Sequence, residues 1–131
     1  MTSPKPGSLV HVELASANPK ATRKFLEEVF DWRFETVPGL EYYPFGTPSG
    51  PGGAVMPLSE ERPKGVLNYF LSEEIDRDIG RIQAAGGRLL TSKTEIPGVG
   101  WWVLFEEPGG CVLALFQART VERGPVARYR T

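Results

Sequence analysis

Apolar and polar residues follow the same course twice along this chain. Each half opens with an extended apolar run, at residues 9–14 and 66–71. A stretch of about 12 residues with apolar side chains at helical spacing follows, and then come a turn and shorter extended runs. Each half closes on the motif Pro-Gly-Gly-x-Val-x-x-Leu, at residues 51–58 and 108–115. A Pro-Gly-Gly turn that leads into a short apolar run is typical of a turn followed by a β-strand.

The two copies of this motif begin 57 positions apart, and the segments before them align at an offset of 56. At that offset His11 aligns with Leu67, and Asn18 aligns with Glu74. Alignments at nearly one offset, with the same order of elements, indicate an internal repeat. We therefore predict an α+β fold of two tandem βαβββ modules. The predicted divisions are a leader at 1–7, a first module at 8–58, a linker at 59–65, a second module at 66–117 and a tail at 118–131, all in one domain.

Local signals place the two helices. Asn18 can cap a helix and Pro19 suits its first position, so the first helix is predicted to begin there. The second helix follows the acidic segment 72–76, which suits the positive end of a helix dipole, and ends at Gly86-Gly87. The predicted apolar stripe of the first helix consists of Ala21, Phe25, Leu26, Val29 and Phe30. Further strands are predicted at 32–37, 41–45, 88–92, 101–106 and 110–117, with a loop at 96–100.

The first strand carries unlike residues on its two faces. Because side chains alternate along a strand, Val10, Val12 and Leu14 share one face. The opposite face carries an imidazole and a carboxylate, from His11 and Glu13. These two side chains are the first candidates for chemistry.

Composition and charge narrow the class of protein. A chain of 131 residues with 40% hydrophobic and 24% charged residues is long enough for one globular domain with a real core. The net charge of −1 gives no reason to expect binding to nucleic acid or to an anionic membrane surface. No apolar run approaches the ~18 residues of a membrane helix, and the N-terminus lacks the apolar core of a signal peptide, so a cytoplasmic protein is expected.

The single cysteine, Cys111, excludes an intramolecular disulfide and a Cys-rich zinc site. Its position within an apolar run predicts a small buried residue of the last strand rather than a reactive thiol.

The order of elements and several local patterns together resemble the vicinal oxygen chelate superfamily. This superfamily includes glyoxalase I, the bleomycin-resistance proteins, fosfomycin-resistance enzymes and extradiol dioxygenases. The resemblance covers about residues 8–117. It rests on His11-x-Glu13-Leu14 before Asn18-Pro19, on Phe25-Leu26-x-x-Val29-Phe30-Asp31-Trp32, on Gly86-Gly87-Arg88, on Ile96-Pro97-Gly98-Val99-Gly100-Trp101 and on Glu107-Pro108-Gly109-Gly110. It implies that each module curls its part of a mixed sheet into a half-barrel and that the two modules surround a cavity.

The resemblance also implies where a metal would bind. Metal-dependent members hold a divalent ion through side chains of the first and last strand of each module, and the ion stabilises an enolate or similar oxyanion. The corresponding positions here are His11, Pro57, Leu67 and Ala114, of which only His11 can bind a metal. We therefore expect no cofactor. The alternative is a divalent cation at a different site that uses Glu13 and other carboxylates.

The cavity that the resemblance implies would be mostly apolar and aromatic. If His11 faces it, strand alternation brings side chains of the fifth and last strands to the same side, together with one of Trp101 and Trp102 and with Tyr43 or Phe45. The candidate ligand-binding residues are Tyr43, Phe45, Tyr69, Trp101, Trp102, Ala114 and Phe116. Such a lining is typical of a small-molecule site. The alternative is that the aromatic residues are ordinary core and that His11 and Glu13 form a structural pair.

Three functions remain open. The first is a metal-independent protein of the bleomycin-resistance kind that binds a small aromatic or amphiphilic molecule. The second is an enzyme, a metal-free lyase or isomerase in which His11 is the general base and Glu13 orients it; a dioxygenase would need a non-standard metal site. The third is a structural or regulatory module whose cavity is filled by its own side chains. By analogy with two-module relatives, we also expect a homodimer.

Overall fold

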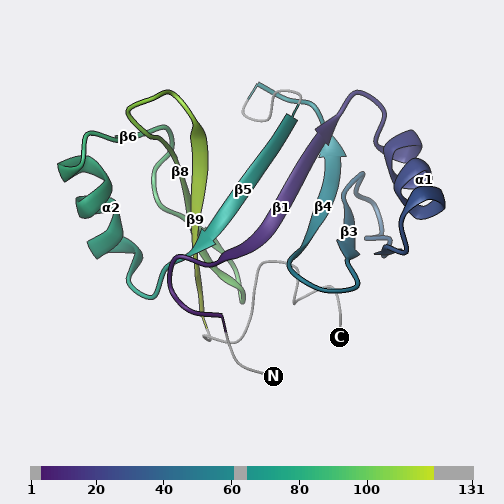
Figure 1. The fold of residues 1–131 in the computed structure, drawn as a ribbon, viewed down its shortest axis with the longest axis horizontal. Helices are drawn as coiled ribbons and strands as arrows, with labels where there is room; N and C mark the ends of the chain where they lie inside the picture. The colour runs from purple at the N-terminus through teal and green to yellow at the C-terminus, as the bar shows by residue number, and fades with distance from the viewer. Residues whose placement is uncertain (1–3, 61–64, 120–131) are drawn as a thin grey trace.

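The computed structural model of the protein describes residues 4–60 and 65–119 and contains two modules that share one mixed sheet (Figure 1). The first module comprises β1 (Leu9–Ser16), α1 (Pro19–Val29), β2 (Arg33–Phe34), β3 (Tyr43–Gly46) and β4 (Gly52–Pro57). The second comprises β5 (Gly65–Leu71), α2 (Ile75–Ala84), β6 (Arg88–Leu89), β7 (Thr94–Ile96), β8 (Gly100–Glu106) and β9 (Val112–Ala118). The predicted α+β class with two tandem modules is confirmed. The predicted leader, linker and tail fall partly outside the described residues.

The nine-stranded sheet is open, and the two modules meet at its centre. The strand order is β2-β3-β4-β1-β5-β9-β8-β6, with β7 paired to β8. The equivalent strands β1 and β5 lie side by side and antiparallel, and each has the last strand of its own module as a parallel neighbour. Val12 pairs with Asn68, its equivalent at the offset of 56, so a pseudo-two-fold axis passes through this pair.

The sheet has two distinct faces. The helix face carries Leu14, Val55 and Leu115 and packs against both helices. In Figure 1 the two helices lie at opposite ends of the molecule, with β1 and β5 between them. The opposite face, here called the histidine face, carries His11, Glu13 and Ala15 of β1 together with the β5, β9 and β8 residues paired with them.

The helix boundaries follow from local chemistry. Asn18 caps α1, since its Oδ1 accepts the amide of Ala21 at 3.1 Å, and Pro19 is the first helical residue. In α2 the side chain of the cap residue Glu74 makes no capping bond, and Gln117 of β9 instead accepts the amide of Ile75 at 2.7 Å. The helix ends at glycines as predicted.

The α1 helix buries less of its apolar stripe than its spacing predicts. Leu26 is buried, but Phe25, Val29 and Phe30 are 59%, 55% and 48% exposed. The strand β2 beside the helix is only two residues long, so the sheet below α1 is too narrow to cover a stripe of that width.

Other expectations are also corrected by the structure. Cys111 is exposed rather than buried, because β9 begins one residue later and Cys111 belongs to the preceding turn. The strands after each helix, β2 and β6, have two residues each, shorter than predicted. The region expected to be a loop before Trp101 contributes to β7 through Ile96. Among the described residues, no helix has both the length and the apolar character needed to cross a lipid bilayer.

Candidate functional site

His11 lies near the middle of the histidine face and is completely buried. Neither Nδ1 nor Nε2 of its ring finds a hydrogen-bond partner in the structure as described. Leaving a buried polar atom without a partner costs about 1–3 kcal/mol, and native proteins rarely do so without a reason. Among residues 4–60 and 65–119, His11 is the one whose buried side-chain nitrogens lack a hydrogen-bond partner.

Glu13 and Tyr69 complete a polar cluster around His11. The Tyr69 hydroxyl donates to Oε1 of Glu13 at 2.8 Å. The other carboxylate oxygen, Oε2, lies 3.6 Å from Nε2 of His11. The His11 and Tyr69 rings meet edge to face, with 5.2 Å between centroids. Tyr69 thus holds the carboxylate, and the carboxylate lies just beyond hydrogen-bond distance of the imidazole.

The pairing of β1 with β5 creates this cluster. His11 lies opposite Tyr69, and Glu13 lies opposite Leu67. Glu13 and Tyr69 are equivalent positions of the two modules, 56 residues apart, and their hydrogen bond therefore crosses the pseudo-two-fold axis. Within the described ranges, the other buried residues beside this cluster on the same face are apolar, among them Leu67, Ala114 and Phe116.

The structure brings together only part of the predicted ligand-binding set. Tyr69, Trp102, Ala114 and Phe116 share the histidine face, with Trp102 partly exposed.

Tyr43, Phe45 and Trp101 lie on the helix face instead. Tyr43 pairs with Val55, and Phe45 pairs with Gly53, a register that turns both rings towards α1. The Trp101 ring lies among residues packed against α2, below the guanidinium of Arg119 at 4.7 Å.

The side chains of the histidine face do not fit a metal centre. A divalent ion such as Zn²⁺ takes three or four protein ligands, and this face offers His11 and Glu13. In residues 4–60 and 65–119 no three His, Cys, Asp or Glu side chains are grouped to hold a metal. Leu67 and Ala114 occupy two of the family positions. Pro57 is exposed and pairs with Ser16 of the helix face, whereas Ala54 is the residue of β4 opposite Glu13.

The contact between Glu13 and Tyr69 was not predicted, although a signal for it exists. At the repeat offset of 56, Glu13 aligns with Tyr69. In two strands that pair about a two-fold axis, only the residues near the centre of the pairing lie close to their equivalents, and the pair of Val12 with Asn68 marks that centre here. The choice of β1 and β5 as the central pair is the information that the sequence pattern lacks.

Comparisons with known proteins agree with this architecture. No family model matches the chain. A putative glyoxylase of Mycobacterium tuberculosis, CFP32, is 24% identical over 115 residues, which cover 82% of this chain and 44% of that protein. The anthracycline biosynthesis protein DnrV of Streptomyces peucetius is 24% identical over 148 residues, which cover 96% of this chain and 52% of that protein. The chain thus spans about half the length of the curated relatives it matches.

Solved structures share the fold over nearly the whole chain. Methylmalonyl-CoA epimerase from Mycobacterium tuberculosis superposes with a TM-score of 0.68 at 16% identity, covering 92% of this chain and 94% of that one. A glyoxalase/bleomycin resistance protein/dioxygenase superfamily member from Vibrio splendidus superposes with a TM-score of 0.65 at 15% identity, covering 83% and 97%.

Proposed function

Since the chain is a member of the vicinal oxygen chelate superfamily by its fold and its sequence relatives, we propose that it binds a small aromatic or amphiphilic molecule on the histidine face. The observation that carries this proposal is His11, a buried imidazole whose two nitrogens have no hydrogen-bond partner among the residues that the structure describes. A polar atom of a ligand would supply the missing hydrogen bond. This hydrogen bond would then offset the unfavourable free energy of burying the His11 nitrogens.

The surroundings of His11 favour an aromatic or otherwise flat ligand. Three aromatic rings lie on the same face, the buried Tyr69 and Phe116 and the partly exposed Trp102, and they would line the space that opens beside His11. Aromatic rings that stack or meet edge to face contribute about 0.5–1.5 kcal/mol beyond the area that they bury. The names of DnrV and its relative DauV refer to anthracyclines, which makes an anthracycline a reasonable first probe.

A fluorescence titration tests this proposal. An anthracycline is added to the protein while the emission of its tryptophans is followed, and His11→Leu is compared with the wild type. The matched control is Asn68→Leu, a similar polar-to-apolar change on the same strand pair but on the opposite face. We expect a saturable change that weakens at least tenfold in His11→Leu and persists in Asn68→Leu. Equal binding by wild type and His11→Leu would rule out the proposed site.

The kinetics of binding should reflect the burial of His11. Because the ring is fully buried, a ligand can reach it only after a local opening of the structure. We therefore expect an association rate constant below the usual range of about 10⁵–10⁷ M⁻¹s⁻¹. Stopped-flow mixing with the same probe measures this rate constant.

A second candidate function is metal-free acid–base catalysis. The observation that favours it is the carboxylate of Glu13 at 3.6 Å from Nε2 of His11, near enough to orient a general base after a small shift. The two functions differ in one result. His11→Ala abolishes turnover of a lyase or isomerase substrate while binding survives, whereas in a pure binding protein there is no turnover to lose.

The absence of a metal cofactor and the homodimer remain parts of this proposal. Elemental mass spectrometry of the purified protein, before and after soaking with Ni, Zn, Mn and Fe(II), should detect no near-stoichiometric metal. Bound metal that disappears in His11→Ala would return the protein to oxygen-chelate chemistry. Sedimentation equilibrium should give the mass of a dimer of this 14.5 kDa chain.

A further inference from the structure

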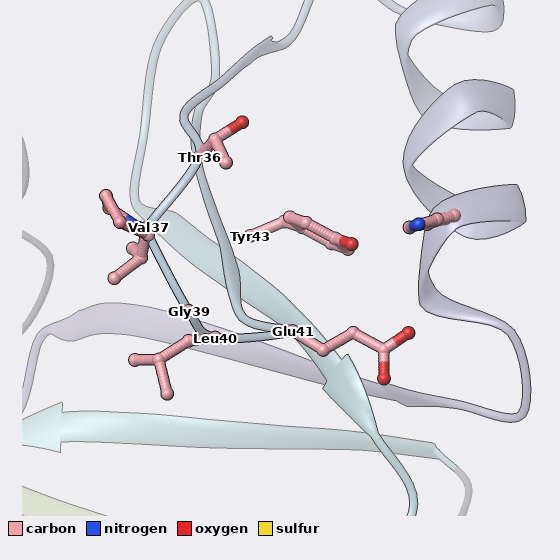
Figure 2. A pocket seen from close by; sticks show the side chains of 8 residues that line it. Thr36, Val37, Gly39, Leu40, Glu41 and Tyr43 are labelled. Atoms are coloured by element: carbon pink, nitrogen blue, oxygen red, sulfur yellow. The ribbon is translucent and has the colours of Figure 1, made fainter.

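A cavity that is open to solvent lies on the helix face, on the other side of the sheet from His11. It has a volume of about 350 Å³ and opens between the first turn of α1 and the loop that joins β2 to β3 (Figure 2). The residues that line it are Lys20, Thr36, Val37, Pro38, Gly39, Leu40, Glu41 and Tyr43. Its size is at the lower end of small-molecule sites, which range from about 300 to 1,000 Å³.

The wall of this cavity presents a phenol without a partner. Tyr43 is only 6% exposed, and no hydrogen bond joins its hydroxyl to the described residues. Figure 2 shows the side chain extending from the strand towards α1, with its oxygen foremost. The guanidinium of Arg23 lies 5.3 Å from the centre of the ring and donates to the Thr36 hydroxyl at 3.1 Å. The wall is therefore held in place while the hydroxyl stays available.

Opposite charges flank the cavity without neutralising each other. Lys20 lies on α1 and Glu41 on the loop, and neither forms an ion pair within the described part of the chain. In contrast, the neighbouring cations of α1 are paired, Arg23 with Glu27 at 3.3 Å and Lys24 with Glu28 at 3.9 Å. One ammonium and one carboxylate are thus left to meet a ligand.

The start of α1 adds to the attraction for an anion. The positive end of a helix dipole favours negative charge, and α2 places Asp76 and Asp78 in its first turn. The first turn of α1 has no acidic residue and carries Lys20. A bound carboxylate would supply there the negative charge that α2 obtains from its own side chains.

The remaining wall is apolar and shaped by a turn. Leu40 donates its amide to the carbonyl of Val37 at 3.1 Å, and Gly39 between them has a φ of +77°, a conformation that favours glycine. Figure 2 shows the side chains of Val37 and the 55% exposed Leu40 on the side of this turn away from α1, whereas those of Glu41 and Tyr43 point towards the helix. The apolar side chains therefore line the outer part of the cavity, and the polar groups line the part next to α1.

We propose that this cavity binds a small zwitterion of the α-amino-acid type with an apolar side chain. Its carboxylate meets the ammonium of Lys20 and the hydroxyl of Tyr43. Its ammonium meets the carboxylate of Glu41, and its apolar side chain extends over the turn towards the outer part of the cavity, which Val37 and Leu40 line. The site is independent of the histidine face, because β3 turns Tyr43 to the other side of the sheet.

A titration with three related probes tests the proposal on the full chain. L-leucine carries both charges, 4-methylpentanoate lacks the ammonium, and 3-methylbutylamine lacks the carboxylate. Amide chemical shifts in ¹⁵N-labelled protein report binding. We expect saturable shifts around 36–43 with L-leucine and affinities at least tenfold lower for the other two probes. Equal affinity of L-leucine and either fragment, or no saturation with L-leucine at millimolar concentrations, would overturn the proposal.

Charge-removing variants assign the contacts. Lys20→Gln should lower the affinity for L-leucine at least fivefold and leave that for 3-methylbutylamine unchanged, and Glu41→Gln should do the reverse with 4-methylpentanoate. The matched control is Lys24→Gln, which removes the same charge from the same helix outside the cavity. A loss in Lys24→Gln as large as in Lys20→Gln would show general electrostatics and contradict the site. Since His11→Leu should keep L-leucine binding, failure here is distinguishable from failure of the anthracycline site.

Discussion

His11 is expected to lower the stability of the fold while it contributes to the proposed binding. Its two buried nitrogens have no hydrogen-bond partner in the described part of the chain, so an apolar side chain of similar volume should stabilise the fold better. We expect His11→Leu to raise the free energy of unfolding by about 1 kcal/mol while it weakens binding at least tenfold, as is common when a functional residue is replaced. Urea denaturation followed by circular dichroism measures this change.

The comparison variant for this experiment is Tyr69→Phe, which removes the hydroxyl group that donates to Glu13 and keeps the aromatic ring. We expect a loss of about 1–3 kcal/mol, because the change removes a hydrogen bond to a buried carboxyl group. If His11→Leu destabilised the protein as much as Tyr69→Phe, His11 would be an ordinary core residue, and the case for the site would fail.

Glu107 makes a separate prediction for acid conditions. The amides of Cys111 and Gly109 donate to its carboxylate and hold the pKa below its ordinary value of 4.5. A carboxyl group whose pKa is lower in the folded state stabilises the protein above the unfolded pKa, and this stability is lost as the pH falls through the folded value. Glu107→Gln should therefore lose less stability than the wild type between about pH 6 and about pH 3. Urea midpoints measured across this pH range test this prediction. The control is Glu28→Gln, a change at an exposed glutamate.

At the residue scale, strand alternation correctly placed His11 and Glu13 on one face, because the period of two leaves no freedom once β1 is recognised. It could not decide the face of Tyr43 or choose between Trp101 and Trp102. Their faces depend on strand registers set by loops of unequal length, and a shift of one residue exchanges the faces. The exposure of Cys111 depended in the same way on where β9 begins.

Among the strands, the pairing of β1 with β4 depends on a glycine. A Cβ atom at Gly53 would overlap the carbonyl oxygen of Val12 and lie 2.8 Å from the Phe45 ring. We expect Gly53→Ala to lower the free energy of unfolding by about 3 kcal/mol or more, since backbone must move. The control, Gly80→Ala in α2, meets nothing within 4 Å and should stabilise by about 0.5–1 kcal/mol. Thermal melts of both variants test the pair, and a tolerated Gly53→Ala would contradict this tight packing.

Element boundaries were predictable where particular residue types mark the end of a helix. Asn18-Pro19 and Gly86-Gly87 mark helix ends through capping and backbone conformation, which are local effects. The lengths of β2 and β6 were not predictable, because a strand extends only as far as its neighbour pairs with it. The hydrogen bond by which Gln117 caps α2 comes from β9, far along the chain, and no local sequence pattern predicts it.

At the scale of the molecule, the central pairing of β1 with β5 should make the two modules unfold together. Trp32 packs in the first module, stacked on Phe45 at 4.6 Å, whereas Trp101 and Trp102 belong to the second. We expect the fluorescence midpoint in urea to coincide with the circular dichroism midpoint in Trp32→Phe and also in the double variant Trp101→Phe, Trp102→Phe. Separate midpoints within either variant would show that the modules unfold independently.

The architecture as a whole was the most predictable level. The offset of 56 between repeats carries the order of elements, and that order predicts two similar modules. The repeat does not say how the modules meet. That depends on which strand of each presents an unpaired edge suited to the other, and here β1 and β5 do so.

The edge strands of the sheet affect the tendency of the protein to aggregate at high concentration. One edge is β2, with two residues, and the other is divided between β6 and β7, with two and three residues. Long unpaired edges act as templates on which further chains add strands and grow into aggregates. Within the described part of the chain, neither end of the sheet offers a long template, because the outermost strands have two or three residues each and cannot give a new strand a continuous ladder of hydrogen bonds. Short outermost strands therefore disfavour the growth of this sheet into fibrous aggregates.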